Sequence, residues 1–166
     1  MASGPVQTQY LKAGADYLDA LRRLGLTPKF AGWGWDRVSE QWLLVLVTSI
    51  VDAGGPLELN RLLFRAYNAK ATPQQISPFI VRIFSPEIVP DNLYLAGEKN
   101  LKIANVKDKG LREPSKVENM QQTFLGIELQ MINSYQNPRQ GKKKPSYHER
   151  RKEWTRFRNS VERLAA

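Results

Sequence analysis

The chain has 166 residues, 42% of them hydrophobic and 25% charged, with a formal net charge of +9. This length and apolar content suit one folded domain and exclude wholesale disorder. The absence of cysteine excludes disulfides, thiolate nucleophiles and cysteine-based zinc sites, and the single His148 excludes any site that needs two imidazoles.

Neither a membrane span nor a secretory signal is expected. The longest near-continuous apolar stretch, residues 42–51, is about half the ~20 residues that a membrane helix needs. The first residues contain neither a basic leader nor an apolar h-region. We therefore expect a cytoplasmic protein.

The first half of the chain alternates helical and strand patterns. Apolar residues at three- and four-residue spacing predict an amphipathic helix over 8–25. Residues 29–36 and 41–51 predict two strands whose short link favours an antiparallel hairpin. The second strand is apolar on both faces, which predicts a central strand covered on both sides. A helix over 56–69 follows a turn, with proline as its first residue.

The second half of the chain contains further strand and helix patterns. Residues 79–84 predict a third strand, and 92–96 with 101–106 predict a second hairpin. Capping boxes, a serine followed three residues later by glutamate, open a helix over 115–135 and a last helix over 146–166. The last helix has an apolar stripe formed by Trp154, Phe157, Val161 and Leu164.

Together these elements predict an α+β fold: a mainly antiparallel sheet of three to five strands covered by helices, with a basic amphipathic C-terminal helix. We expect a compact domain over 1–136, an exposed basic linker over 137–145 and the C-terminal helix over 146–166. The third strand follows a helix, so a crossover permits it to run parallel to the second, and the strand order stays open. The expected core includes Trp42, Leu44, Leu46, Leu62, Leu63, Ile83 and Phe124.

The positive charge is concentrated at the C-terminus. From residue 139 onward there are ten basic and three acidic residues, a net of +7, whereas residues 1–138 carry 15 basic and 13 acidic residues, a net of +2. Basic side chains neutralise phosphates and release condensed counterions, which gives affinity without sequence readout. We therefore predict nucleic-acid contacts by Arg139, Lys142, Lys143, Lys144, Arg150, Arg151, Lys152, Arg156 and Arg158.

Other interpretations of the basic segment stay open. The domain could mediate protein–protein contact or oligomerisation, with the basic helix docked on a partner. The same amphipathic pattern suits an anionic membrane surface, and a charged face can also be merely solvated. Nucleic-acid binding and protein–protein contact can be separated by experiment. DNA and RNA binding by the full chain would be compared with binding by a form truncated after Gln136.

Two tryptophans on the first predicted strand also have two interpretations. Trp33 and Trp35 are alternate residues and so project from the same face, with a glycine between them. They could stack on unpaired bases. Large aromatic side chains are more often buried, however, and we favour a place for both in the core.

Catalytic chemistry has little support in the sequence. Asp36 and Asp52 fall at opposite ends of the predicted hairpin, whereas metal-assisted hydrolysis needs converging carboxylates. A nuclease or hydrolase that uses these aspartates is the least favoured hypothesis. The glycine-rich segment 52–56 lacks the lysine and hydroxyl residue of a phosphate-binding loop, so we assign no catalytic residue, metal or cofactor.

Overall fold

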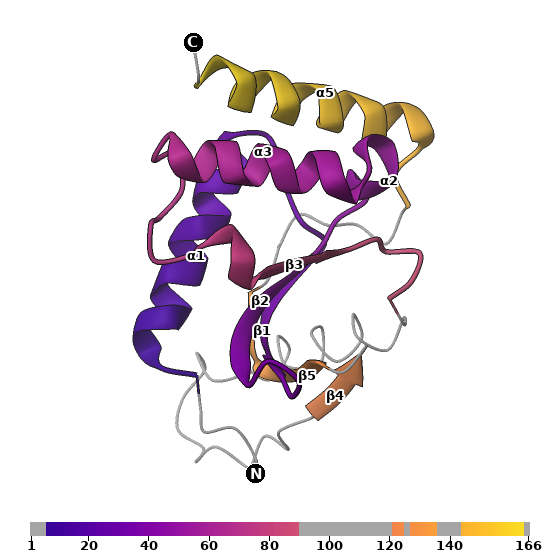
Figure 1. Cartoon of the computed structure of the whole chain (residues 1–166). Helices are drawn as coiled ribbons and strands as arrows, with labels where there is room; N and C mark the ends of the chain where they lie inside the picture. The colour runs from indigo at the N-terminus through magenta and orange to yellow at the C-terminus, as the bar shows by residue number, and fades with distance from the viewer. Residues whose placement is uncertain (1–5, 90–120, 125–126, 136–143, 165–166) are drawn as a thin grey trace, which may run out of the picture.

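The computed structural model describes residues 6–89, 121–124, 127–135 and 144–164 (Figure 1). The helices in these parts of the chain are α1 (Thr8–Arg23), α2 (Val51–Gly54), α3 (Pro56–Asn68) and α5 (Tyr147–Arg163), with a 3-10 turn, η1, at Pro78–Ile80. The strands are β1 (Phe30–Asp36), β2 (Gln41–Val47), β3 (Val81–Phe84), β4 (Gln121–Phe124) and β5 (Ile127–Tyr135). The combination of helices and sheet confirms the α+β class.

The described strands form one sheet in the order β3-β2-β1-β5-β4. β1 and β2 form the predicted antiparallel hairpin, with Trp33 opposite Leu44. β3 pairs with β2 in parallel after the crossover through α2 and α3, whereas β1 with β5 and β4 with β5 are antiparallel. The sheet is therefore mixed, which corrects the predicted mainly antiparallel sheet. The crossover explains the parallel pair. It carries the chain from the end of β2 back to the edge of the sheet where β2 begins, so β3 runs in the same direction as β2.

The predicted helix over 115–135 is wrong, because its described part forms strands β4 and β5. Apolar residues at 124, 127, 131 and 135 fit a helical period, but residues 127–131 also alternate between apolar and polar side chains, as a strand does. The side of β1 away from β2 needs a partner for its backbone N–H and C=O groups, and β5 supplies it. Tertiary pairing thus overrides the local helical pattern. The predicted hairpin of 92–96 with 101–106 lies outside the described residues.

Both faces of β2 are buried, as predicted for a central strand. Leu44 and Leu46 join Trp33 and the helices in one apolar cluster. Leu43, Val45 and Val47, on the opposite face, join Phe30, Val89 and Ile127 in a second cluster. Among the expected core residues, Leu62 and Leu63 are also buried, while Trp42 and Ile83 are half-buried against the first cluster. The side chain of Phe124 lies outside the described part.

α5 packs on the body through its apolar stripe. Trp154, Phe157 and Val161 belong to the same cluster as residues of α1 and α3. The predicted capping box at its start is confirmed: Ser146 Oγ accepts from Glu149 N over 3.2 Å, and Glu149 Oε2 accepts from Ser146 N over 2.6 Å. Leu164, which we expected in the stripe, is instead 40% exposed just beyond the helix end.

Candidate nucleic-acid interface

Two glycines allow α5 to approach the body closely. A Cβ on Gly54 of α2 would overlap the ring of Trp154, so only glycine leaves room for the indole. Gly25, which follows α1, has a φ of +96° and lies against the side chain of Arg156. The position of α5 is therefore set by close backbone contacts with both of these segments.

Two polar contacts hold the same helix. The backbone N–H of Thr27 donates to Glu153 Oε1 over 3.1 Å. Burial raises the pKa of the Glu153 carboxyl, and this hydrogen bond offsets part of that effect. Arg150 Nη1 lies 3.8 Å from Asp52 Oδ2, and each side chain is only about a quarter exposed. Arg150 is thus engaged with α2.

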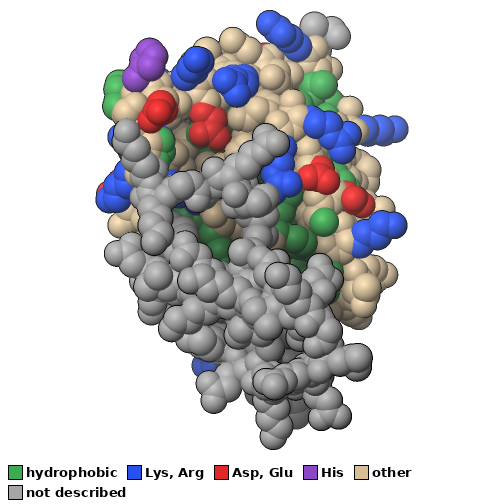
Figure 2. Space-filling model, turned by 180° about the vertical axis from the view of Figure 1, so that it is seen from behind, with side chains coloured by type: hydrophobic (Ala, Val, Ile, Leu, Met, Phe, Trp, Pro, Cys, Tyr) green, Lys and Arg blue, Asp and Glu red, His purple; other side chains and the backbone are tan. Residues whose placement is uncertain are grey.

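The remaining predicted contact residues fall into two groups. Lys144, Arg151, Lys152, Arg156 and Arg158 are exposed, whereas Arg139, Lys142 and Lys143 lie outside the described residues. Figure 2, which views the molecule from behind, shows Lys and Arg side chains over the upper part of the molecule, where α5 lies in Figure 1. Asp and Glu side chains are interspersed among them. Most of the predicted contact residues that the structure describes therefore remain exposed, although α5 is packed on the body.

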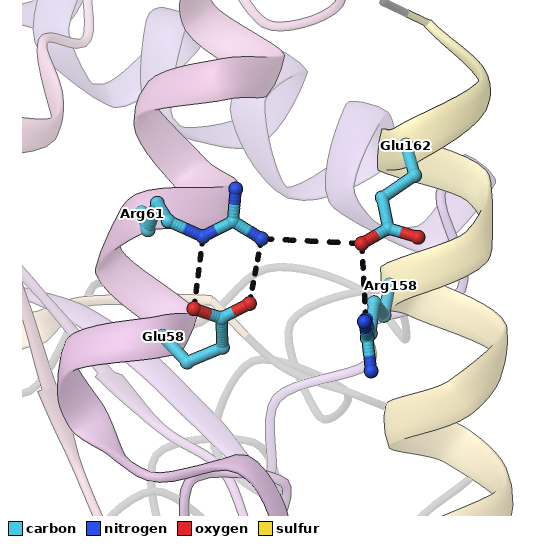
Figure 3. Close-up of polar contacts among 4 residues, drawn as sticks. All are labelled: Glu58, Arg61, Arg158 and Glu162. Atoms are coloured by element: carbon cyan, nitrogen blue, oxygen red, sulfur yellow. Dashed lines mark hydrogen bonds and ion pairs between the residues drawn. The ribbon is translucent and has the colours of Figure 1, made fainter.

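A four-residue charge cluster joins α5 to α3 (Figure 3). Arg61 donates to Glu58 through Nε over 2.8 Å and through Nη2 over 2.6 Å, and this contact lowers the pKa of Glu58. Glu162 Oε1 lies 3.9 Å from Arg61 Nη2 and accepts from Arg158 Nε over 3.0 Å. One carboxylate oxygen is therefore shared by two guanidinium groups from different helices.

Sequence reasoning missed Arg61 as a neighbour of the basic helix. Glu58 and Arg61 are three residues apart, so their own pairing is visible in the sequence. The placement of Arg61 beside Arg158 depends instead on the packing of α3 against α5. No linear spacing signals that contact.

The core interpretation holds for Trp33 but not for Trp35, which belongs to neither apolar cluster. Trp33 is fully buried. Trp35 is half-buried, and its ring meets that of Trp42 edge to face at a centroid distance of 5.5 Å. Trp33 is therefore not accessible to an unpaired base, and Trp33 and Trp35 do not form a stacking platform.

The two aspartates do not form a catalytic pair. Asp36 accepts hydrogen bonds from Ser39 Oγ over 2.6 Å and from Val38 N over 2.9 Å, and the Ser39 bond is the main reason that its pKa is lowered. Asp52 lies beyond the other end of β2 and pairs with Arg150. In the described part of the chain, no group of three or more His, Cys, Asp or Glu side chains converges on a metal-sized site.

Comparison of the chain with protein-family models, curated proteins and solved structures finds no match. Among the described residues, no helix is both long and apolar enough to cross a bilayer.

Proposed function

We propose that this protein is a cytoplasmic, non-enzymatic nucleic-acid-binding protein that contacts the phosphate backbone, with low sequence specificity, through α5 and the basic residues that precede it. The observation that carries the proposal is the division of α5 into two sides. Trp154, Phe157 and Val161 are buried in the protein's own core, while Lys and Arg side chains of the same helix are exposed.

This division favours a polyanion over the alternatives weighed from the sequence. A helix that lies in a membrane surface or in a partner's groove inserts its apolar side. In α5 that side packs against α1 and α3, so it is already occupied. The exposed side offers cations, which match phosphates without any apolar contact.

The charge distribution supports the same proposal. The whole chain carries +9, so long-range attraction to a polyanion adds to the local contacts. Arg150 contributes less than the sequence predicted, because its side chain is only about a quarter exposed and is paired with Asp52. The accessible contacts proposed in the described part are Lys144, Arg151, Lys152, Arg156 and Arg158.

A charge-matched pair of variants tests this function. The first carries Lys144→Gln, Arg151→Gln and Lys152→Gln, and the control carries Lys12→Gln, Arg23→Gln and Lys70→Gln. All six side chains are exposed, so neither variant should lose stability. Binding to labelled duplex DNA, single-stranded DNA and RNA is measured by fluorescence anisotropy at several salt concentrations.

The first variant should bind every probe more weakly, and its slope of log affinity against log salt should fall by about one unit for each lost phosphate contact. The control should retain the slope of the unaltered protein. If the unaltered protein fails to bind any probe at low salt, the proposed function is wrong. If both variants lose affinity equally, the contacts are not concentrated at α5.

A further inference from the structure

The exposed cations of α5 form two rows along the helix. Arg151 and Arg158 are seven residues apart, two turns, and so lie on one side. Lys152, Arg156 and Arg163, at spacings of four and seven, lie on another side, roughly 130° around the axis at 3.6 residues per turn. All five side chains are exposed. We name these sets the first row and the second row.

Uncharged polar side chains and one carboxylate, that of Glu162, lie between the rows. His148, Thr155 and Asn159 have helical positions midway between the first and second rows, and all three are exposed. Thr155 Oγ1 donates to the carbonyl oxygen of Arg151 over 2.9 Å, which keeps it close to the helix surface. The line midway between the rows is therefore polar, with positive charge on either side and the Glu162 carboxylate next to the first row.

We propose that α5 enters the major groove of a B-form DNA duplex, with the first row on the phosphates of one strand and the second row on those of the other. This inference rests on the proposed function and specifies its ligand. An α-helix with its side chains is about 10–12 Å wide, which matches a major groove about 12 Å wide. Cations on both flanks of a helix in that groove meet the two backbones that border it.

The packing of α5 suits this placement. The helix runs along the outer edge of the molecule, with α3 directly beneath it in Figure 1. Its buried stripe and the Gly54–Trp154 contact fix its rotation, so the line that carries His148 and Asn159 stays outward. These two side chains would face the base edges, where a histidine or an asparagine can form hydrogen bonds.

The charge cluster of Glu58, Arg61, Arg158 and Glu162 reduces the availability of one first-row cation to phosphate. Arg158 donates to Glu162, and Arg61 lies 3.9 Å from the same carboxylate oxygen. A phosphate near Arg158 must compete with this internal anion. Removing the charge of Glu162 should therefore strengthen binding to duplex DNA, and Arg61, which is about half exposed, becomes an additional cation at the border of the groove.

The experiment compares three probes of equal length: duplex DNA, duplex RNA and single-stranded DNA. The major groove of an A-form RNA duplex is deep and too narrow for a helix. Duplex DNA should therefore bind at least about tenfold more tightly than duplex RNA at the same salt concentration. A major-groove ligand such as methyl green should displace the protein from duplex DNA, and a minor-groove ligand such as netropsin should not.

Row variants test the two-strand contact. Arg151→Gln with Arg158→Gln removes charge from the first row, and Lys152→Gln with Arg156→Gln removes charge from the second. Each pair should weaken binding to duplex DNA by about tenfold, since each removes two phosphate contacts. Lys12→Gln with Lys70→Gln is the charge-matched control, and melting curves of all variants verify the fold. Glu162→Gln should increase the affinity.

The outcomes separate the groove placement from the proposed function. Equal binding to duplex DNA and duplex RNA, dependence on one row only, or displacement by netropsin alone would overturn the groove placement and leave phosphate binding intact. If the protein binds none of the three probes, both the groove placement and the proposed function are wrong.

Discussion

The indole Nε1 of Trp33 donates a hydrogen bond to the hydroxyl of Tyr135 over 2.8 Å, although the two residues are 102 positions apart. That hydroxyl in turn donates to the carbonyl oxygen of Leu11 over 2.5 Å. A Cβ on Gly14 would overlap the same hydroxyl, so glycine allows Tyr135 to reach the helix backbone. β1, β5 and α1 are thus joined at one phenol group.

Replacing Tyr135 by phenylalanine tests this link. Tyr135→Phe leaves the N–H of the buried Trp33 without its partner, which should lower the free energy of unfolding by about 1–3 kcal/mol. Urea denaturation measures the change. Tyr147→Phe is the matched control, because Tyr147 is 65% exposed and its substitution should leave the midpoint unchanged. Equal midpoints for both variants would show that the link contributes nothing to stability.

The contact between Gly54 and Trp154 predicts an unusual glycine effect. Glycine to alanine within a helix ordinarily stabilises a protein. Gly54→Ala should instead destabilise the fold by about 1–3 kcal/mol, because its methyl group overlaps the indole ring. A double-mutant cycle with Trp154→Leu measures the coupling: the alanine should cost less once the indole is removed. Additive effects would mean that the ring moves aside freely.

The environment of Glu153 predicts a dependence of stability on pH. Burial raises the pKa of this carboxyl in the folded state, so the folded protein favours the protonated form. The contribution of Glu153 to stability is fully present at pH values below the pKa that its carboxyl has in the unfolded chain. This contribution is lost as the pH rises through the higher pKa of the folded state. Glu153→Gln should therefore be more stable than the unaltered protein at neutral pH. This advantage should shrink as the pH falls through the raised pKa of the folded state, and it should be absent below the unfolded pKa of about 4.3.

Urea titrations at neutral and acidic pH check the effect of Glu153→Gln. Glu87→Gln serves as control, because the Glu87 side chain is 58% exposed and should show little effect. If the stability gained by Glu153→Gln is the same at both pH values, the titration argument is contradicted.

The central position of β2 predicts the effect of a buried charge. Leu46 is fully buried, and Leu46→Asp places a carboxylate in the apolar cluster at a cost of several kcal/mol. A domain of this kind has a total stability of about 5–15 kcal/mol, so no folded soluble protein is expected. Val38→Asp, at a site 90% exposed in the hairpin turn, should fold normally. Unchanged melting of Leu46→Asp would disprove the central strand.

Local chemistry determined much of this architecture. The capping box of Ser146 with Glu149, the proline that opens α3 and the apolar periodicities of α1 and α5 act between residues a few positions apart. These signals can therefore be recognised without the fold. The hairpin of β1 and β2 and the double-sided burial of β2 follow from the same kind of pattern, since a strand apolar on both faces must be covered on both.

Only the tertiary structure decided the secondary structure of residues 127–135 and the partners of the basic helix. An apolar spacing that fits a helix becomes β5 because β1 has an unpaired side that the local pattern does not reveal. Arg150 meets Asp52, and Glu162 meets Arg61, because α5 packs on α2 and α3. The sequence alone determined how many cations the C-terminus carries; which of them stay exposed depends on acidic partners that are remote in the chain.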